Sequence, residues 1–167
     1  MGVSLTPDMR AVIQSAHLCF AATVSPDGMP NLSPKGTIRV WDDRHLYFLD
    51  LASPGTRANL RERPWMELNV VEQLSRRGYR FFGPATLHTG DATFEEATRR
   101  ILGREQLPPP ATVVLLEVAR VAPLISPGYW RVADELAMRE IWRERRAELD
   151  REFERYLTGV EPFRVKR

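Results

Sequence analysis

Short strand-like segments separated by turn residues run from residue 18 to residue 121, and they constrain the fold more than any other feature of the chain. Each segment is rich in apolar and β-branched residues, and Gly, Pro, Asn, Asp or Ser marks most of the boundaries between them. The strands predicted from this pattern cover residues 18–24, 31–41, 45–50, 65–71, 77–89 and 112–121. Six short strands with few helices predict a mainly β protein built as a small barrel, not a doubly wound sheet.

Helices are predicted at both ends of the chain and between the strands. Thr6 before Pro7 has the pattern of a helix start, and Ser53 before Pro54 repeats it as the expected cap of a second helix. Further helices are predicted over 93–102 and 134–157, with a proline-rich connector at 106–110 and a stop at Thr158-Gly159. We interpret the last helix as a packed apolar stripe under solvated charges, and the stripe is Met138, Trp142, Leu149, Phe153 and Tyr156.

The composition predicts an ordinary cytoplasmic protein. The 167 residues are expected to form a single domain, with a barrel core at 18–124 and a C-terminal helical extension at 125–167. A net charge of +2 does not favour nucleic acid as a partner. No apolar run approaches the roughly 20 residues that span a membrane, and no secretory signal is evident. The single cysteine, Cys19, is expected in the core, and the three separated histidines predict no metal site.

No motif in the sequence indicates a catalytic side chain. A nucleophile elbow, a Walker loop and a dinucleotide-binding glycine pattern are all missing, so a bound cofactor is the expected source of any chemistry. The start of the helix after Ser53 could bind a phosphate through its amides, the Ser53 and Thr56 hydroxyls and Arg57, or could be an ordinary helix with Arg57 in solvent. Lys35, beside Gly36, could contact the same ligand or be an exposed edge-strand charge, and Arg80 is equally open.

The order of these cues resembles the FMN-binding split barrels of the pyridoxamine 5'-phosphate oxidase-like family. The resemblance covers residues 18–124 and rests on the order of the cues. These include Ser33-Pro-Lys-Gly36, the strand ending in Asp50 and the stretch from Ser53 to Arg57. It implies a six-stranded antiparallel split β-barrel with an N-terminal helix and a long C-terminal helix. It also implies a homodimer with FMN at the interface, which performs two-electron transfer on an undetermined small molecule.

The resemblance further implies which residues meet the cofactor. They are Ser33, Pro34, Lys35, Gly36, Leu49, Asp50, Leu51, Ser53, Thr56 and Arg57, with Gly78, Tyr79 and Arg80 supplied by the partner chain. Asn59 matches a recurrent asparagine of the family. Trp41, Tyr79 and Trp130 are candidates for a substrate wall, or for the core or the dimer interface.

Two departures from the family pattern limit the expected activity. Gly55 stands where many relatives carry Lys or Arg at the phosphate turn. The tail from Pro162 to Arg167 contains no histidine, so neither vitamin B6 oxidation nor haem ligation through a C-terminal histidine is expected. Two alternatives stay open: a deazaflavin-dependent reductase on the same fold, and a non-enzymatic binding or regulatory module that uses the Arg-rich last helix.

Overall fold

The computed structural model describes residues 2–103, 107–158 and 160–161. By their internal contacts the described residues form two compact units. The barrel unit comprises the chain up to Glu72 together with Arg77–Ile125, and the helical unit comprises Gln73–Arg76 together with the chain from Ser126 onwards. The single-domain organisation expected from the sequence stays a prediction. Gln106 and Gly159, which carry parts of the predicted connector and helix stop, lie outside the described residues.

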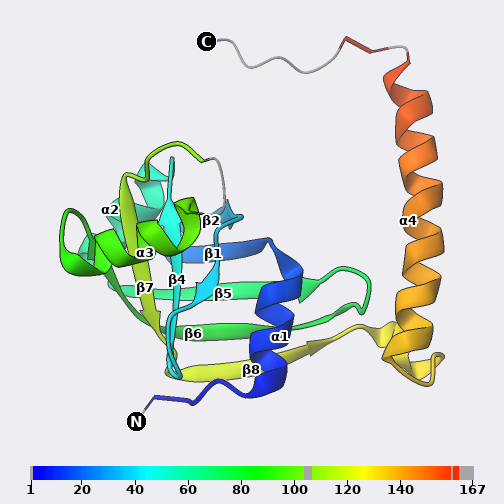
Figure 1. Ribbon diagram of the computed structural model, residues 1–167, viewed down its shortest axis with the longest axis horizontal. Helices are drawn as coiled ribbons and strands as arrows, with labels where there is room; N and C mark the ends of the chain where they lie inside the picture. Colours follow the sequence, from blue (N-terminus) through cyan, green and yellow to red (C-terminus); the bar gives the residue numbers. More distant parts are fainter. Residues whose placement is uncertain (1, 104–106, 159, 162–167) are drawn as a thin grey trace. The chain divides into compact units, whose positions relative to one another are not determined.

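The barrel unit is built on an antiparallel sheet in which eight strands are described (Figure 1). They are β1 (Cys19–Val24), β2 (Pro30–Lys35), β3 (Arg39–Val40), β4 (His45–Asp50), β5 (Trp65–Glu72), β6 (Arg77–His88), β7 (Thr112–Glu117) and β8 (Arg120–Ile125). The strand order is β2-β1-β5-β6-β7-β4-β3, and β8 pairs with β6. This curled antiparallel arrangement confirms the predicted split-barrel class.

Strand β6 joins the two halves of the barrel. Its first part pairs with β5 and β8, and its last four residues, from Ala85 to His88, pair with β7. In Figure 1, β4 and β7 consequently run across the direction of β1, β5 and β8. Gly83 lies where β6 passes between the halves, and a Cβ there would approach the Glu117 carbonyl oxygen to 1.8 Å. Only glycine permits this close backbone approach.

Two of the six predicted strands are each divided in two. The segment 31–41 forms β2 and β3, because backbone pairing with β1 stops before Gly36 and the side-chain hydroxyl of Thr37 then bonds to the neighbouring strand. This hydroxyl donates to the Leu49 carbonyl and accepts from the Leu49 amide, both at 3.0 Å. The segment 112–121 forms β7 and the start of β8, because the chain turns at Val118. At this turn the Val118 amide donates to the carbonyl of Arg44, just before β4, and the Ala119 amide donates to the carbonyl of Phe82 in β6. Hydrophobic periodicity carries no information on such long-range hydrogen bonds.

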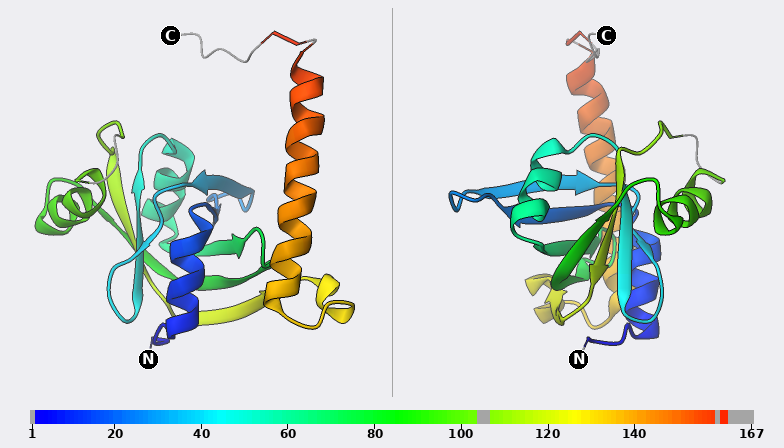
Figure 2. Two further views of the ribbon diagram at one scale, coloured as in Figure 1. Left: turned by 45° about the vertical axis from the view of Figure 1, so that its right-hand side comes forward. Right: turned by 90° about the vertical axis from the view of Figure 1, so that its left-hand side faces the viewer.

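Three helices complete the barrel unit: α1 (Pro7–Ala16), α2 (Pro54–Glu62) and α3 (Ala92–Leu102). Helix α1 packs against β5 and β6, and α3 packs against β4 and β7 (Figure 2). Thr6 caps α1 as predicted, since its hydroxyl accepts from the Met9 amide at 3.2 Å. The predicted cap at Ser53 is wrong: this side chain makes no capping bond to α2, because it is bonded to Asp50 and Lys35.

The core of the barrel unit contains the single cysteine. Cys19 is fully buried in a large cluster of apolar residues from α1 and the sheet, and burial raises the pKa of its thiol to about 12. The prediction of an inert core cysteine is therefore confirmed. A second cluster, formed by α3 on β4 and β7, surrounds Tyr47 and Leu49. In the part of the chain that the structure describes, no helix combines the length and apolarity needed to cross a membrane.

The helical unit consists of the turn Gln73–Arg76, the short helix η1 (Pro127–Trp130) and α4 (Glu135–Leu157). Met138 is buried, but Leu149, Phe153 and Tyr156 are 41%, 60% and 68% exposed. The predicted packed stripe is therefore wrong over the C-terminal half of α4. The periodicity made the face amphipathic, but the described contacts of the helical unit leave Leu149, Phe153 and Tyr156 exposed.

Candidate functional site

A cavity of about 420 Å³ lies where β2 ends and the chain leaves β4. Its walls include seven of the ten residues expected to meet the cofactor within one chain, although they come from segments some 15 positions apart in sequence. The lining residues are Ser33, Pro34, Lys35, Gly36, Thr37, Leu49, Asp50, Leu51, Ala52 and Leu107. The volume falls within the range of about 300–1,000 Å³ that small-molecule sites occupy. Thr37, Ala52 and Leu107 were missed by the sequence reasoning.

A buried carboxylate organises the polar side of this cavity. Asp50 is only 1% exposed and accepts the Ser53 hydroxyl, as well as the Ser53 amide at 3.2 Å. Its second oxygen, Oδ2, lies 2.5 Å from an Arg57 guanidinium nitrogen. Lys35 Nζ lies 3.8 Å from Oδ1. A buried charge of this kind is tolerable because it is paired and hydrogen-bonded on both oxygens.

Lys35 points into the same cluster. Its ammonium donates to Ser33 Oγ at 2.5 Å and to Ser53 Oγ at 2.9 Å, and the residue is 5% exposed. Burial lowers the pKa of Lys35 below its usual value, and the neighbouring Asp50 carboxylate partly offsets that effect. The alternative of an exposed edge-strand lysine is therefore wrong. Arg57 is likewise an ion-pair partner of Asp50 and not a free solvent charge.

Thr56 does not line the cavity, because it belongs to a polar network that holds α2 to the sheet. Asn31 Nδ2 donates to Thr56 Oγ1 at 3.2 Å and to Thr23 Oγ1 at 3.0 Å. Asn59 Nδ2 donates to the same Thr23 hydroxyl at 3.0 Å. Asn59 therefore has a structural role, because its side chain ties α2 to β1. Thr23 and Asn31, which position α2, carried no recognisable signal in the sequence.

Gly78, Tyr79 and Arg80 do not line the cavity of their own chain. A Cβ at Gly78 would lie 1.9 Å from the Val70 carbonyl oxygen, so this glycine serves close packing of β6 on β5. Arg80 Nε lies 3.5 Å from Glu67 Oε1. Their contribution to a partner's site stays a prediction.

Tyr79 is held by a polar clamp between α1 and β6. Its hydroxyl donates to Asp8, and Arg77 donates two bonds of 2.8 Å to the same carboxylate. The Arg77 and Tyr79 hydrogen bonds lower the pKa of Asp8, and the bond to Asp8 raises the pKa of Tyr79. Trp41, another candidate for a substrate wall, does not line the cavity and packs edge-on against Tyr47. Trp130 belongs to the helical unit and is 89% exposed.

A larger and more apolar hollow, of about 920 Å³, lies over β1, β2 and β5. Leu32 and Trp65 on its wall are 65% and 48% exposed, and Trp65 stacks on Phe82 at 5.2 Å. The exposed side of a sheet is ordinarily polar, so this apolar surface is unusual for an isolated chain. Leu32 sits between polar neighbours in the sequence, so alternation alone would place it on the buried face, and its outward position on β2 could not have been predicted from this pattern.

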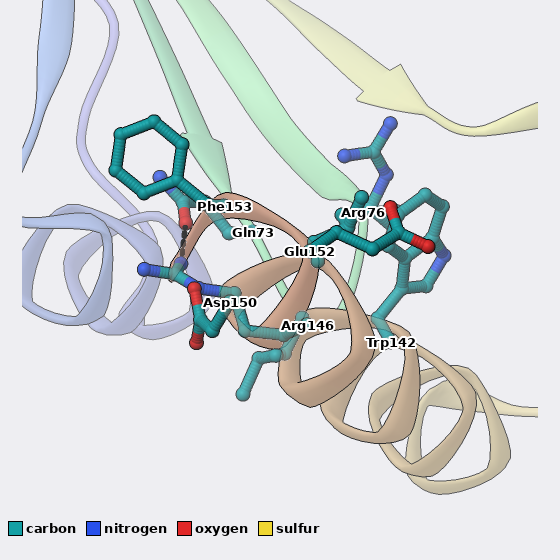
Figure 3. Close-up of a pocket in the computed structure, with 9 residues that line it drawn as sticks. Gln73, Arg76, Trp142, Arg146, Asp150, Glu152 and Phe153 are labelled. Carbon is teal, nitrogen blue, oxygen red and sulfur yellow. Dashed lines mark hydrogen bonds and ion pairs between the residues drawn. The ribbon is translucent and has the colours of Figure 1, made fainter. Parts of the chain in front are cut away.

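The helical unit has a hollow of its own, of about 730 Å³, between the turn Gln73–Arg76 and α4 (Figure 3). Arg146 donates to the Gln73 side chain at 2.8 Å, and the Arg76 guanidinium lies 4.0 Å above the Trp142 ring. Both arginines therefore already hold the turn on the helix. We assign no ligand to this hollow.

Among the described residues, no group of three His, Cys, Asp or Glu side chains could hold a metal ion. His45 and His88 each pair with one aspartate, Asp42 and Asp91, at 2.8 and 2.9 Å.

The comparison with known families covers the barrel unit. Residues 5–124 match the family model of pyridoxamine 5'-phosphate oxidase. The chain belongs to this family. The match ends before α4 begins at Glu135, so membership in the pyridoxamine 5'-phosphate oxidase family describes the barrel and leaves the last helix unaccounted for.

Solved structures support the same conclusion. HupZ of Group A Streptococcus is 32% identical, covers 72% of this chain and 94% of its own, and superposes with a TM-score of 0.66. An FMN-binding protein from Syntrophomonas wolfei (13% identity, 70% and 88% coverage, TM-score 0.56) shares the fold. An F420 reductase (16% identity, 70% and 98% coverage, TM-score 0.54) shares it too. No curated protein matches the chain.

Proposed function

We propose that this protein is a homodimeric flavoprotein that binds FMN in the cavity at the ends of β2 and β4 and performs two-electron transfer on a small molecule. The observation that carries the proposal is the polar cluster at the cavity, because two cations and two hydroxyls converge beside a cavity of ligand size. Its members are Ser33, Lys35, Asp50, Ser53 and Arg57. The S. wolfei relative, which is named for binding FMN, lends support on the same fold.

The residues of the cavity suit the separate parts of FMN. Lys35, Arg57 and the Ser33 and Ser53 hydroxyls would hold the phosphate, together with the first-turn amides of α2, which Ser53 does not cap. Leu49, Leu51 and Leu107 would provide an apolar wall for the ring system. The flavin, when bound, supplies the two-electron chemistry, and the chain supplies binding, orientation and exclusion of water. We assign no catalytic side chain.

A second copy of the chain would cover the apolar hollow over β1, β2 and β5. Its exposed wall, with Leu32 and Trp65, is the kind of surface that marks an interface between proteins. In such a homodimer, Gly78, Tyr79 and Arg80 of the partner would complete each cofactor site. Light scattering after size exclusion should give the mass of a dimer for the wild type and of a monomer for Leu32→Arg.

The cofactor is tested by the visible absorption spectrum of the purified protein, before and after FMN is added and the excess removed. Retained flavin bands support the proposal. A colourless protein that does not take up FMN would overturn it. Arg57→Ala should release the flavin, whereas Arg61→Ala, an exposed arginine on the same helix, should retain it.

The runner-up is a deazaflavin-dependent reductase, which the F420 reductase on the same fold supports. A competition titration of the purified protein with FMN and the deazaflavin would separate the two cofactors.

A further inference from the structure

An apolar stripe is left exposed along the C-terminal half of α4. Leu149, Phe153 and Tyr156 are 41%, 60% and 68% exposed, and they follow one another at spacings of four and three residues. Trp142 continues the stripe towards the start of the helix and is half-buried under the Arg76 guanidinium. Large aromatic side chains gain much from burial, so a stripe of this kind marks an interface with another protein surface.

The stripe has the repeat of a coiled coil. Trp142, Leu149 and Tyr156 are seven residues apart, and Phe153 lies at the second inward position of the same heptads. Arg146 occupies the position of Phe153 one heptad earlier. In a parallel pair of α4 helices the two copies of Arg146 would face each other in the seam, whereas an antiparallel pair can set each beside the partner's Leu149. The seam therefore favours an antiparallel pair.

The charges beside the stripe are self-complementary in the same orientation. Arg143 and Asp150 lie on one flank, and Arg145 and Glu152 lie on the other. If the two-fold axis passes between positions 147 and 148, Arg143 faces the partner's Asp150, and Arg145 faces the partner's Glu152. Each contact occurs twice by symmetry, and all four join opposite charges. This charge complementarity identifies a second copy of α4 as the surface that covers the stripe.

The same register brings an aromatic ring to the hollow of the helical unit. Phe153 of each copy would meet the partner's Trp142, which lines this hollow between the turn Gln73–Arg76 and α4 (Figure 3). Aromatic side chains that meet in a partly enclosed hollow at the centre of an interface commonly dominate its binding energy. The apolar and the charged contacts thus require one and the same register.

We infer that α4 pairs antiparallel with α4 of a second copy of this chain, through Trp142, Leu149, Phe153 and Tyr156. The inference rests on the homodimer of the proposed function and adds a helix–helix contact to the barrel interface proposed there. Because each copy offers only a few apolar residues, the helix pair strengthens the dimer and does not replace the barrel interface. It gives the segment that lies beyond the family match a role in assembly.

The test is cross-linking of single introduced cysteines with a short bismaleimide. The natural Cys19 is fully buried and its thiol has a pKa of about 12, so it should not react. Leu149→Cys lies near the two-fold axis and should link two copies. Tyr156→Cys should not, because the two copies of this position lie about 25 Å apart in the antiparallel pair. Arg151→Cys, on the side of α4 opposite the stripe, is the control for random collision.

A charge swap tests the register. Glu152→Arg sets two like charges opposite each other, beside the partner's Arg145, and should lower the cross-linked fraction of Leu149→Cys severalfold. Adding Arg145→Glu makes the charges opposite again and should restore the cross-link. A purely local disturbance of α4 by Glu152→Arg would not be rescued by this second substitution.

Light scattering of the same variants before cross-linking separates this inference from the proposed function. The expected result is the mass of a dimer together with an efficient cross-link at position 149. A dimer in which Leu149→Cys links no better than Arg151→Cys would overturn the helix pair and leave the homodimer standing. Equal linking of Tyr156→Cys and Leu149→Cys would show a parallel pair and overturn the inference as well. A monomer without cross-links would overturn the homodimer of the proposed function too.

Discussion

Replacing Lys35 by methionine tests the candidate site most directly, because this buried ammonium is the cation that lines the cavity. Methionine keeps the length and apolar volume of the side chain and removes its charge and its bonds to Ser33 and Ser53. A hydrogen bond to a charged group is worth about 1.5–3 kcal/mol. Since each 1.4 kcal/mol is a factor of ten, the dissociation constant for FMN should rise about 10- to 150-fold.

The same substitution should change how stability depends on pH. Burial lowers the pKa of Lys35 in the folded state below its ordinary value of 10.5. Between the folded and the ordinary pKa, the unfolded chain binds more protons, so the wild-type free energy of unfolding gains from Lys35 as pH rises. The difference in unfolding free energy, wild type minus Lys35→Met, should therefore increase from pH 7 towards pH 10 in urea titrations.

Fluorescence titration with FMN decides the first result, with Arg61→Met on the exposed side of α2 as the control. An unchanged control shows that loss of positive charge in general is not responsible. If Lys35→Met bound FMN within about twofold of the wild type, Lys35 would not contact the cofactor. The assignment of the cavity as the phosphate site would then be refuted.

Three further substitutions test the barrel and the site. Gly83→Ala should lower the free energy of unfolding by about 2 kcal/mol or more, since its Cβ would collide with the Glu117 carbonyl; a urea titration that matches the wild type would contradict the close approach. Gly55→Lys should tighten FMN binding severalfold by adding a cation in the first turn of α2, and an unchanged titration would mean that the phosphate lies elsewhere. Asp8→Asn should lower stability at pH 7. Because Arg77 depresses the pKa of Asp8 below 3.8, this deficit should vanish as pH falls through the depressed pKa; a constant deficit would contradict the clamp.

Much of the barrel could be predicted from local sequence, because strand and turn preferences act over a few residues. The turns after Val24 and Asp50, the start of α1 at Thr6 and the long β6 all lie close to where the pattern indicated. The division of 31–41 into β2 and β3 could not be predicted, because it depends on a bond between Thr37 and Leu49, twelve residues away. The exposure of Phe153 was missed for the converse reason: periodicity describes a face but not what covers it.

The sequence by itself determined which residue types are available to a phosphate-binding cavity: a lysine before a glycine on one strand, and an arginine in the first turn of a helix. Only the tertiary structure decided what those charges do. It buried Lys35 and brought the Ser53 hydroxyl into a hydrogen bond with the Lys35 ammonium in place of a helix cap. It also placed Asp50 between Lys35 and Arg57. The physical reason is that the strength of a charge–charge interaction depends on distance and on exclusion of water, and both are set by how β2, β4 and α2 pack together.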